Sequence, residues 1–213
     1  MCGRYELKVK FNKLPALLKK EMPKGFEDNY QYQESIKPND PVIVLKNEGR
    51  TNTSIMLWGY IPEWSKDPFS GRRPFNARAE TVRTRKIFKE SWTHKRCLLP
   101  ASAFHEKGHR FSKIDFQPFW LGGIWSKWSS TDGSELESCC ILTTEPNELL
   151  RPIHNRMPVI IAEGKEELWL EQNKNIDELN ALEPFLKHWN PQAWKVESLN
   201  INPNFPNLQL NLF

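Results

Sequence analysis

Proline is the residue that most restricts the fold of this chain, because sixteen prolines are spread through its 213 residues. Proline has no backbone N–H and its ring clashes with the preceding helical turn, so long helices are disfavoured and many short elements are expected. At this length the chain can bury a substantial core in one domain, or in one domain with a small lobe. No internal repeat or low-complexity tract appears in it.

The short runs between turn residues predict mostly strands. Runs rich in β-branched or aromatic residues lie at 42–45, 54–60, 97–104, 119–125, 139–144 and 158–162, with a weaker one at 194–199. Helical periodicity shows around 14–18, within 79–92, and in the later segments 165–171 and 176–186. Since strands outnumber helices, we predict an α+β fold with a largely antiparallel, barrel-like β-sheet core and peripheral helices.

The chain begins Met1-Cys2-Gly3-Arg4, and removal of Met1 would leave Cys2 with a free α-amine beside its thiol. The two groups titrate at about pH 8 and about pH 8.5, so a minority of each is reactive near neutral pH. Such a vicinal aminothiol can attack a carbonyl as an amine and then close a five-membered ring through sulfur. The dipeptide alone is a weak signal, and a cysteine without a role is an equal alternative.

Positive charge is concentrated in one segment, although the net charge of +4 is modest. Residues 72–96 hold nine lysines and arginines against only Glu80 and Glu90. Trp58, Tyr60 and Trp64 lie just upstream, and aromatic faces beside cations hold single-stranded nucleic acid by stacking and charge. The alternatives are a solvated helix face for the charges and, for Asn76, a role as the N-cap of the helix that follows.

The sequence His105-Glu106-Lys107-Gly108-His109 matches the zinc motif H-E-x-x-H, which requires a helix. Here the motif lies between Pro100 and Pro118 and contains a glycine, so a hairpin turning at Lys107-Gly108 fits better. No third-ligand motif follows, and the four cysteines show no Cys-x-x-Cys spacing. We therefore expect no metal, no cofactor and no disulfide, with Glu106 kept as a candidate for moving protons.

Neither a run of about 18 apolar residues nor an N-terminal signal core is present, so we expect a cytoplasmic protein without a membrane partner.

Six short motifs stand in the order and with the spacing of the SOS-response-associated peptidase (SRAP) family, which the chain resembles. They are Met1-Cys2-Gly3-Arg4-Tyr5, Trp58-Gly59-Tyr60-Ile61-Pro62-Glu63-Trp64, Phe75-Asn76-Ala77-Arg78-Ala79-Glu80-Thr81, Arg96-Cys97-Leu98-Leu99-Pro100-Ala101 with Phe104-His105-Glu106, Leu142-Thr143-Thr144, and Ile153-His154-Asn155-Arg156-Met157-Pro158. The resemblance implies a single SRAP-like domain over residues 1–213, with motifs within 2–162 and a C-terminal packing segment at 163–213.

The same resemblance implies a function in the DNA damage response. It implies a monomer that binds single-stranded DNA, captures abasic sites covalently and shields the lesion, and that lies at the nucleoid when bound to DNA. It also implies removal of Met1 by the protein itself or by another enzyme, and suicidal or slowly reversible crosslinking in place of rapid turnover.

Site residues follow from the resemblance position by position. Cys2 resembles the nucleophile whose amine forms an imine with the sugar aldehyde and whose thiol closes a thiazolidine. Asn76 is similar to the asparagine that holds the N-terminal residue, and Glu106 and His154 are similar to the pair that moves protons. The expected DNA-binding residues are Arg4, Arg78 and Arg156 as phosphate-binding cations, with Trp58, Trp64, Thr143 and Thr144.

The chain departs from the family where members commonly carry Phe-Tyr-Glu-Trp, since it has Phe104-His105-Glu106-Lys107. If the family's aromatic wedges against a base, Lys107 has to substitute with charge or the DNA geometry has to differ.

Other functions stay open at this stage. They are an amidotransferase with an N-terminal cysteine, although the chain contains no Asn-Gly, a DNA-binding module without chemistry, and, less favoured, an H-E-x-x-H zinc peptidase.

Overall fold

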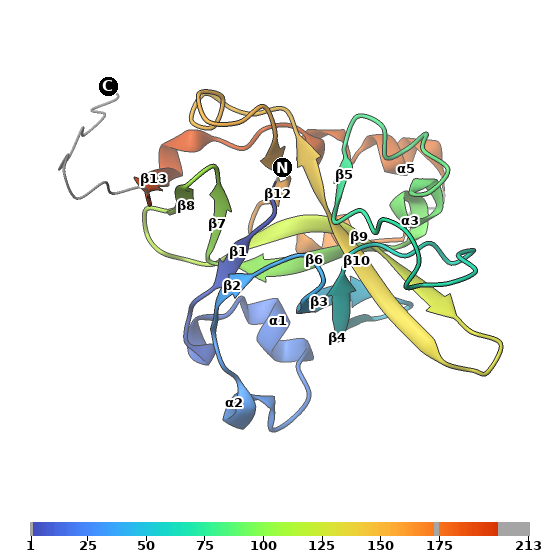
Figure 1. The fold of residues 1–213 in the computed structure, drawn as a ribbon. Helices are drawn as coiled ribbons and strands as arrows, with labels where there is room; N and C mark the ends of the chain where they lie inside the picture. The colour runs from blue at the N-terminus through green and yellow to red at the C-terminus, as the bar shows by residue number, and fades with distance from the viewer. Residues whose placement is uncertain (1, 173–174, 200–213) are drawn as a thin grey trace.

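Two β-sheets form the framework of the structure, a computed structural model that describes residues 2–172 and 175–199 (Figure 1). The strands are β1 (Tyr5–Leu7), β2 (Gln33–Ile36), β3 (Pro41–Asn47), β4 (Thr51–Trp58), β5 (Asn76–Arg78), β6 (Arg96–Ala101), β7 (Ala103–Glu106), β8 (His109–Lys113), β9 (Phe119–Ser129), β10 (Glu135–Thr144), β11 (Met157–Pro158), β12 (Ile160–Ile161) and β13 (Trp194–Ser198). The helices are η1 (Phe11–Lys13), α1 (Ala16–Glu21), α2 (Phe26–Asn29), α3 (Lys89–His94), α4 (Glu166–Leu170), α5 (Ile176–Asn180), η2 (Glu183–Leu186) and η3 (Pro191–Ala193).

The larger sheet closes on itself. Its order is β11-β10-β4-β3-β6-β9-β12, and an additional pairing between β10 and β9 joins β10, β4, β3, β6 and β9 into a barrel of five strands. Pairing is antiparallel except where β10 meets β4 and β5. The prediction of a largely antiparallel, barrel-like core in an α+β fold is confirmed.

Glycine is required where the barrel strands approach most closely. A Cβ atom added to Gly123 on β9 would lie 2.8 Å from the carbonyl oxygen of Cys140 and 2.9 Å from a methyl group of Leu99. Both neighbours belong to the barrel wall, so a side chain at this position would push strands apart.

The smaller sheet has the order β13-β8-β7-β1-β2 and carries the start of the chain. Its β7–β8 hairpin turns at Lys107 and Gly108, which have φ of 48° and 75°. Two consecutive residues with positive φ are typical of the tight turn whose twist suits a hairpin. The hairpin predicted at Lys107-Gly108 is therefore confirmed, and the H-E-x-x-H residues do not lie on a helix.

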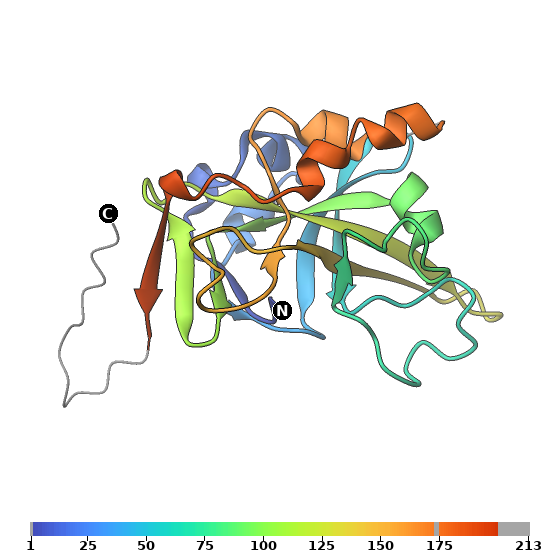
Figure 2. The same ribbon diagram turned by 90° about the horizontal axis from the view of Figure 1, so that it is seen from above.

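The C-terminal helices lie along one side of the sheets, as the view from above shows (Figure 2). Trp169 of α4 is fully buried and donates a hydrogen bond from Nε1 to the carbonyl oxygen of Cys97, at 2.9 Å. Leu182 and Trp194 are also buried. Residues 200–213 of the expected packing segment lie outside the described residues, so a single domain over 1–213 stays a prediction.

The helix predicted within residues 79–92 is wrong for most of its length. Successive turns run from Ala79 to Phe88, and only Lys89–His94 is helical. The backbone N–H of Ala79 donates to the carbonyl oxygen of Thr143, which ties the start of this segment to β10. Val82 and Phe88 are still buried, although the backbone that carries them forms turns and not a helix.

Two predicted strands are divided by the structure. The run at 97–104 becomes β6 in the barrel and β7 in the smaller sheet, and the run at 158–162 becomes β11 and β12. Among the described residues, no helix is long and apolar enough to cross a membrane.

Candidate functional site

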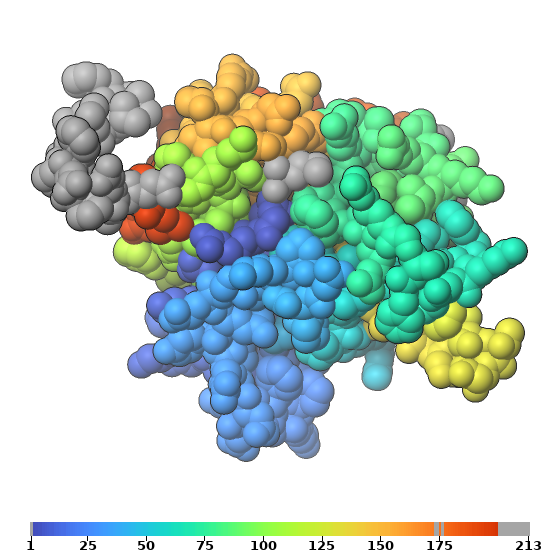
Figure 3. All heavy atoms as spheres, viewed as in Figure 1, coloured from blue at the N-terminus to red at the C-terminus, as the bar shows by residue number. Residues whose placement is uncertain are grey.

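Three segments that are distant in sequence meet around the start of the chain. Figure 3 shows the β7–β8 hairpin, the loop at 145–156 and the segment at 75–86 around the first described residues. Cys2 lies among them with 1% of its surface exposed. The site is thus assembled by tertiary packing around the N-terminal residues.

Asn76 holds Cys2 through its main chain. Its Nδ2 donates to the carbonyl oxygen of Cys2 at 2.9 Å. Asn76 lies on β5 opposite Ile141 of β10, so the alternative role as the N-cap of a helix is wrong. Its Oδ1 is buried without a hydrogen-bond partner in the part of the chain that the structure describes. An unpaired buried acceptor is costly, and an amine on Cys2 is a donor of the kind that such an acceptor lacks.

Glu106 and His154 form a second pair beside Cys2. Glu106 ends β7, and its Oε1 lies 3.8 Å from Nε2 of His154, with side chains that are 10% and 16% exposed. The backbone N–H of Arg156 donates to Nδ1 of His154 at 3.0 Å. Nδ1 also lies 3.2 Å from the carbonyl oxygen of Arg156, so the main chain of Arg156 fixes the ring with Nε2 toward the carboxylate.

The loop that carries His154 is anchored at its base. Leu150 is fully buried, and its backbone N–H donates to Oδ1 of Asn147 at 3.1 Å. Nδ2 of Asn147 donates to the carbonyl oxygen of Trp189 at 3.1 Å. The backbone N–H of His154 then bonds to the carbonyl oxygen of Leu150 at 2.9 Å, so the imidazole projects from a fixed turn.

The Cys2 thiol is not ionised in this environment. Burial, and next the negative charge of Glu106, raise the pKa of the thiol to about 12. Its Sγ lies 3.9 Å from the carbonyl oxygen of Arg4, the distance of a weak S–H···O contact. Sulfur can therefore attack only if a nearby base accepts its proton, and Glu106 is close enough for its charge to act on the thiol.

The three expected phosphate-binding arginines differ in whether a carboxylate of the protein already pairs with the guanidinium. Arg78 is exposed, and neither it nor Arg4 has a carboxylate partner among the described residues. Arg156 instead makes a bidentate pair with Glu80, at 2.7 and 2.8 Å, and also donates to the carbonyl oxygen of Thr143 at 2.5 Å. Arg156 is thus neutralised by a carboxylate, whereas Arg4 and Arg78 keep their charge for a ligand.

The expected aromatic and threonine contacts divide in a similar way. Trp64 is 65% exposed and offers a ring face to solvent. Trp58 is fully buried, packs edge-on against Tyr5 and donates from Nε1 to the carbonyl oxygen of Phe75 at 2.8 Å. Thr143 and Thr144 are buried as well. In this state Trp58 and the two threonines support the site from below its surface.

The basic segment is not one continuous cationic strip. Arg96 is 2% exposed and donates to the carbonyl oxygens of Trp92 and Trp169, both at 2.7 Å. Arg83 pairs with Glu183 at 2.9 Å. Concentrated charge in sequence therefore does not give an equally concentrated charge on the surface.

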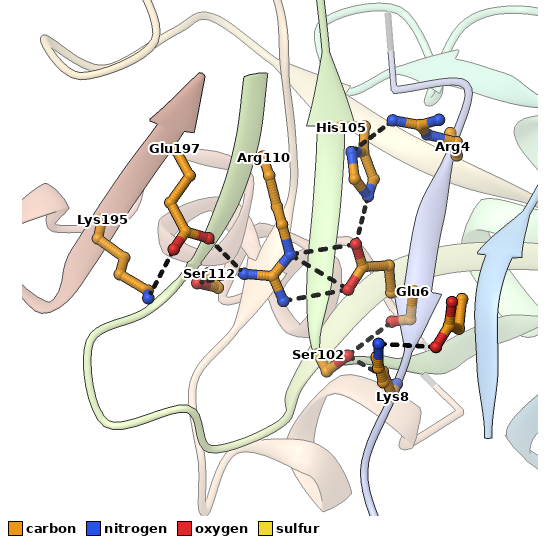
Figure 4. Close-up of polar contacts among 10 residues, drawn as sticks. Arg4, Glu6, Lys8, Ser102, His105, Arg110, Ser112, Lys195 and Glu197 are labelled. Carbon is orange, nitrogen blue, oxygen red and sulfur yellow. Dashed lines mark hydrogen bonds and ion pairs between the residues drawn. The ribbon is translucent and has the colours of Figure 1, made fainter. Parts of the chain in front are cut away.

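A further polar network was not predicted from the sequence (Figure 4). It runs from Arg4 through His105, Glu6 and Arg110 to Glu197. Glu6 and Arg110 are 104 residues apart in sequence, so no local pattern relates them. The described residues contain no group of three or more metal-ligating side chains.

Comparison with protein families identifies one match over nearly the whole chain. A sequence model of the family described as "SOS response associated peptidase (SRAP)" matches residues 1–202. The abasic site processing protein YoaM of Bacillus subtilis is 35% identical over 216 residues, covering 95% of this chain and 94% of YoaM. The abasic site processing protein YoqW of the same organism is 33% identical and covers 98% of both chains.

Solved structures share the fold. A Bacteroides thetaiotaomicron protein superposes with a TM-score of 0.74 at 21% identity, covering 96% of this chain and 97% of its own. A Bordetella bronchiseptica protein gives 0.75 at 20% identity, with 92% and 99% covered.

Proposed function

The chain belongs to the SOS response associated peptidase (SRAP) family, and on that basis we propose that it processes abasic sites in single-stranded DNA by forming a covalent bond through Cys2. Relatives of similar length that carry the name abasic site processing protein support this proposal. The observation that carries it is the hydrogen bond of 2.9 Å by which Asn76 holds Cys2, whose thiol feels the charge of Glu106, the carboxylate that is paired with His154.

The proposed chemistry begins once Met1 has been removed, because an amide nitrogen is not a nucleophile. The amine of Cys2 adds to the aldehyde carbon of the ring-opened sugar, and loss of water gives an imine. Sulfur then adds to the same carbon, and the thiol proton passes to the nitrogen to leave a thiazolidine. One water is released in all, and no oxidant or reductant is needed.

The side chains around Cys2 fit these steps in turn. Asn76 fixes the residue, and its unpaired Oδ1 is available to the amine. His154, when protonated on both ring nitrogens, can give a proton to the departing hydroxyl and return to neutral imidazole, and Glu106 can accept the proton of the thiol as sulfur attacks. An acid and a base within one site suit a reaction that needs both.

DNA would be held by the cations that have no carboxylate partner. We assign phosphate contacts to Arg4 and Arg78, and stacking on a base to Trp64. Arg156 pairs with Glu80 through its guanidinium and donates its backbone N–H to the imidazole of His154. We therefore assign Arg156 to holding the loop of His154 in place. Thr143 supports Arg156 by accepting from its guanidinium at 2.5 Å.

A crosslinking gel tests the proposal. Protein lacking Met1 is incubated with a single-stranded oligonucleotide that bears one abasic site and is then separated under denaturing conditions after heating. We expect a shifted band from the wild type, and none from Cys2→Ala or from protein that retains Met1.

Cys2→Ser is the matched control, because it keeps the amine and loses only sulfur. We expect it to give a band only when borohydride reduces the imine, since an imine without ring closure hydrolyses on heating. A heat-stable band from Cys2→Ala would rule out the proposed nucleophile. Glutaminase activity without crosslinking would instead favour the amidotransferase alternative, and DNA binding without any adduct would favour a binding module.

A further inference from the structure

Arg4 is oriented by a neutral side chain. Its Nη2 lies 2.7 Å from Nδ1 of His105, and the backbone N–H of His105 donates to the carbonyl oxygen of Arg4 at 2.9 Å. A guanidinium only donates, so Nδ1 is the acceptor and the imidazole carries its proton on Nε2. Nε2 is 2.6 Å from Oε1 of Glu6, so one neutral tautomer satisfies both contacts.

Glu6 is itself fixed from the other side. Arg110 donates to both of its carboxylate oxygens, at 3.1 Å from Nε to Oε1 and 3.0 Å from Nη2 to Oε2. Arg110 also donates to Glu197 of β13 at 2.7 Å, and Lys195 donates to Glu197 at 3.0 Å. Hydrogen bonds from His105 and Arg110 outweigh burial and lower the pKa of Glu6 to about 2, so its carboxylate is ionised near neutral pH. Figure 4 shows the continuous series of contacts from β13 to Arg4.

Charge along this series does not cancel. The carboxylates of Glu6 and Glu197 both pair with Arg110, and Lys195 also pairs with Glu197. Arg4 is the cation left at the end of the series without a carboxylate among the described residues. A carboxylate partner would orient Arg4 but would also neutralise it and compete with phosphate, as Glu80 does at Arg156.

From this geometry we propose that His105 is a positioning residue for DNA binding: it orients the Arg4 guanidinium through Nδ1 while leaving its charge and its remaining N–H groups for a phosphate of the strand. The inference rests on the proposed function, since it concerns the same DNA. A guanidinium that is already oriented loses less conformational freedom when it binds.

Three substitutions separate the two nitrogens of the imidazole. His105→Asn places an amide oxygen near the position of Nδ1 and keeps an acceptor for Arg4. His105→Gln reaches toward Glu6 and provides no acceptor at the Nδ1 position, and His105→Phe removes both contacts while keeping a ring. His109→Gln is the control on the same hairpin, because the imidazole of His109 hydrogen-bonds to the carbonyl oxygen of Lys107 and not to Arg4 or Glu6.

The measurement is the affinity for an intact single-stranded oligonucleotide, without an abasic site, as a function of salt concentration. Each phosphate contact on a single strand contributes about 0.7 to the slope of log K against log salt concentration. One such contact therefore raises the affinity at 0.1 M salt about five-fold over its value at 1 M salt. We expect His105→Gln and His105→Phe to lose up to about five-fold and to show the shallower slope. His105→Asn and His109→Gln should stay close to the wild type.

The Arg4→Ala background gives the second readout. If His105 acts through Arg4, His105→Gln should have no further effect once Arg4 is alanine, whereas an additive loss would overturn the proposal. Unchanged binding in His105→Gln and His105→Phe, or an equal loss in all three variants including His105→Asn, would also overturn it. Wild-type protein that binds no single-stranded DNA at all would instead contradict the proposed function.

Discussion

Glu6 should make the stability of the folded protein depend on acid pH, and Glu6→Gln should remove the part of that dependence that belongs to this carboxyl. Burial by itself would raise the pKa of this carboxyl, but hydrogen bonds from His105 and Arg110, together with the charge of Arg110, lower it from 4.5 to about 2. Its side chain is 9% exposed, so solvent screens these contacts little. The ionised form is therefore favoured by folding.

The sign follows from the lowered pKa. A group whose pKa is lower in the folded state stabilises the fold above its unfolded pKa, and this stabilisation is lost as pH falls toward the folded value. The difference between 4.5 and about 2 corresponds to at most about 3.5 kcal/mol, at about 1.4 kcal/mol for each pKa unit. We expect the wild type to lose up to this amount of unfolding free energy through Glu6 between about pH 5 and pH 2.

Urea denaturation at a series of pH values measures the effect. Glu6→Gln should be less stable than the wild type at pH 7, because Arg110 and His105 lose their charged partner, and the difference should shrink as pH falls. Glu34→Gln is the control, since Glu34 is 64% exposed and pairs with the exposed Lys8. Parallel stability curves for the wild type and Glu6→Gln from pH 5 to pH 2.5 would refute the reasoning.

Three further predictions follow from contacts around the site. Asn76→Ala removes the hydrogen bond to the carbonyl oxygen of Cys2 and should slow crosslinking about 100-fold at saturating DNA, as measured in single-turnover gel assays. An unchanged rate would contradict the role of Asn76 in holding Cys2. Glu80→Gln should break the ion pair with Arg156, lower the unfolding free energy measured in urea by about 1 kcal/mol and slow crosslinking. Tighter DNA binding without slower crosslinking would instead show that the freed Arg156 binds phosphate. Trp64→Ala should weaken binding to single-stranded DNA by about 1 to 3 kcal/mol in a fluorescence titration without changing the thermal midpoint, because the ring is 65% exposed, and equal affinity would exclude stacking.

Strand positions were predictable because short apolar runs between turns mark them. β9 and β10 contain the expected runs at 119–125 and 139–144 but extend further, to Ser129 and from Glu135. Their polar ends continue to pair because ladder hydrogen bonds depend on the backbone, and Lys127 pairs with Glu135 across the two strands at 2.8 Å. Apolar patterning therefore locates a strand without fixing its ends.

In the segment at 79–92 the pattern predicted which residues are buried but not the conformation of the backbone. Its spacing of Val82 and Phe88 reports which residues are buried, and a series of turns buries them as well as a helix does. What decides the backbone is the bond from Ala79 to the carbonyl oxygen of Thr143, a contact between residues far apart in sequence. Periodicity alone contains no information about that contact.

The candidate site was predictable to the extent that motifs mark it. The resemblance named Cys2 and Asn76, and the structure brings them within hydrogen-bond distance, while their assigned roles stay proposals. It did not distinguish exposed Trp64 from buried Trp58, since both are tryptophans in one motif. It also gave no sign that Glu80 would occupy the guanidinium of Arg156, because an ion pair across 76 residues has no sequence signature.

The central claim is that Cys2 forms the covalent bond to the abasic site, and the mass of the adduct tests it most directly. Protein lacking Met1 is crosslinked to a short abasic oligonucleotide, digested and analysed by mass spectrometry. If Cys2 is the nucleophile, we expect an adduct on the N-terminal peptide that begins with Cys2, with a mass equal to the sum of the two partners less one water. An adduct on any other peptide, or one on a chain that still carries Met1, would contradict it.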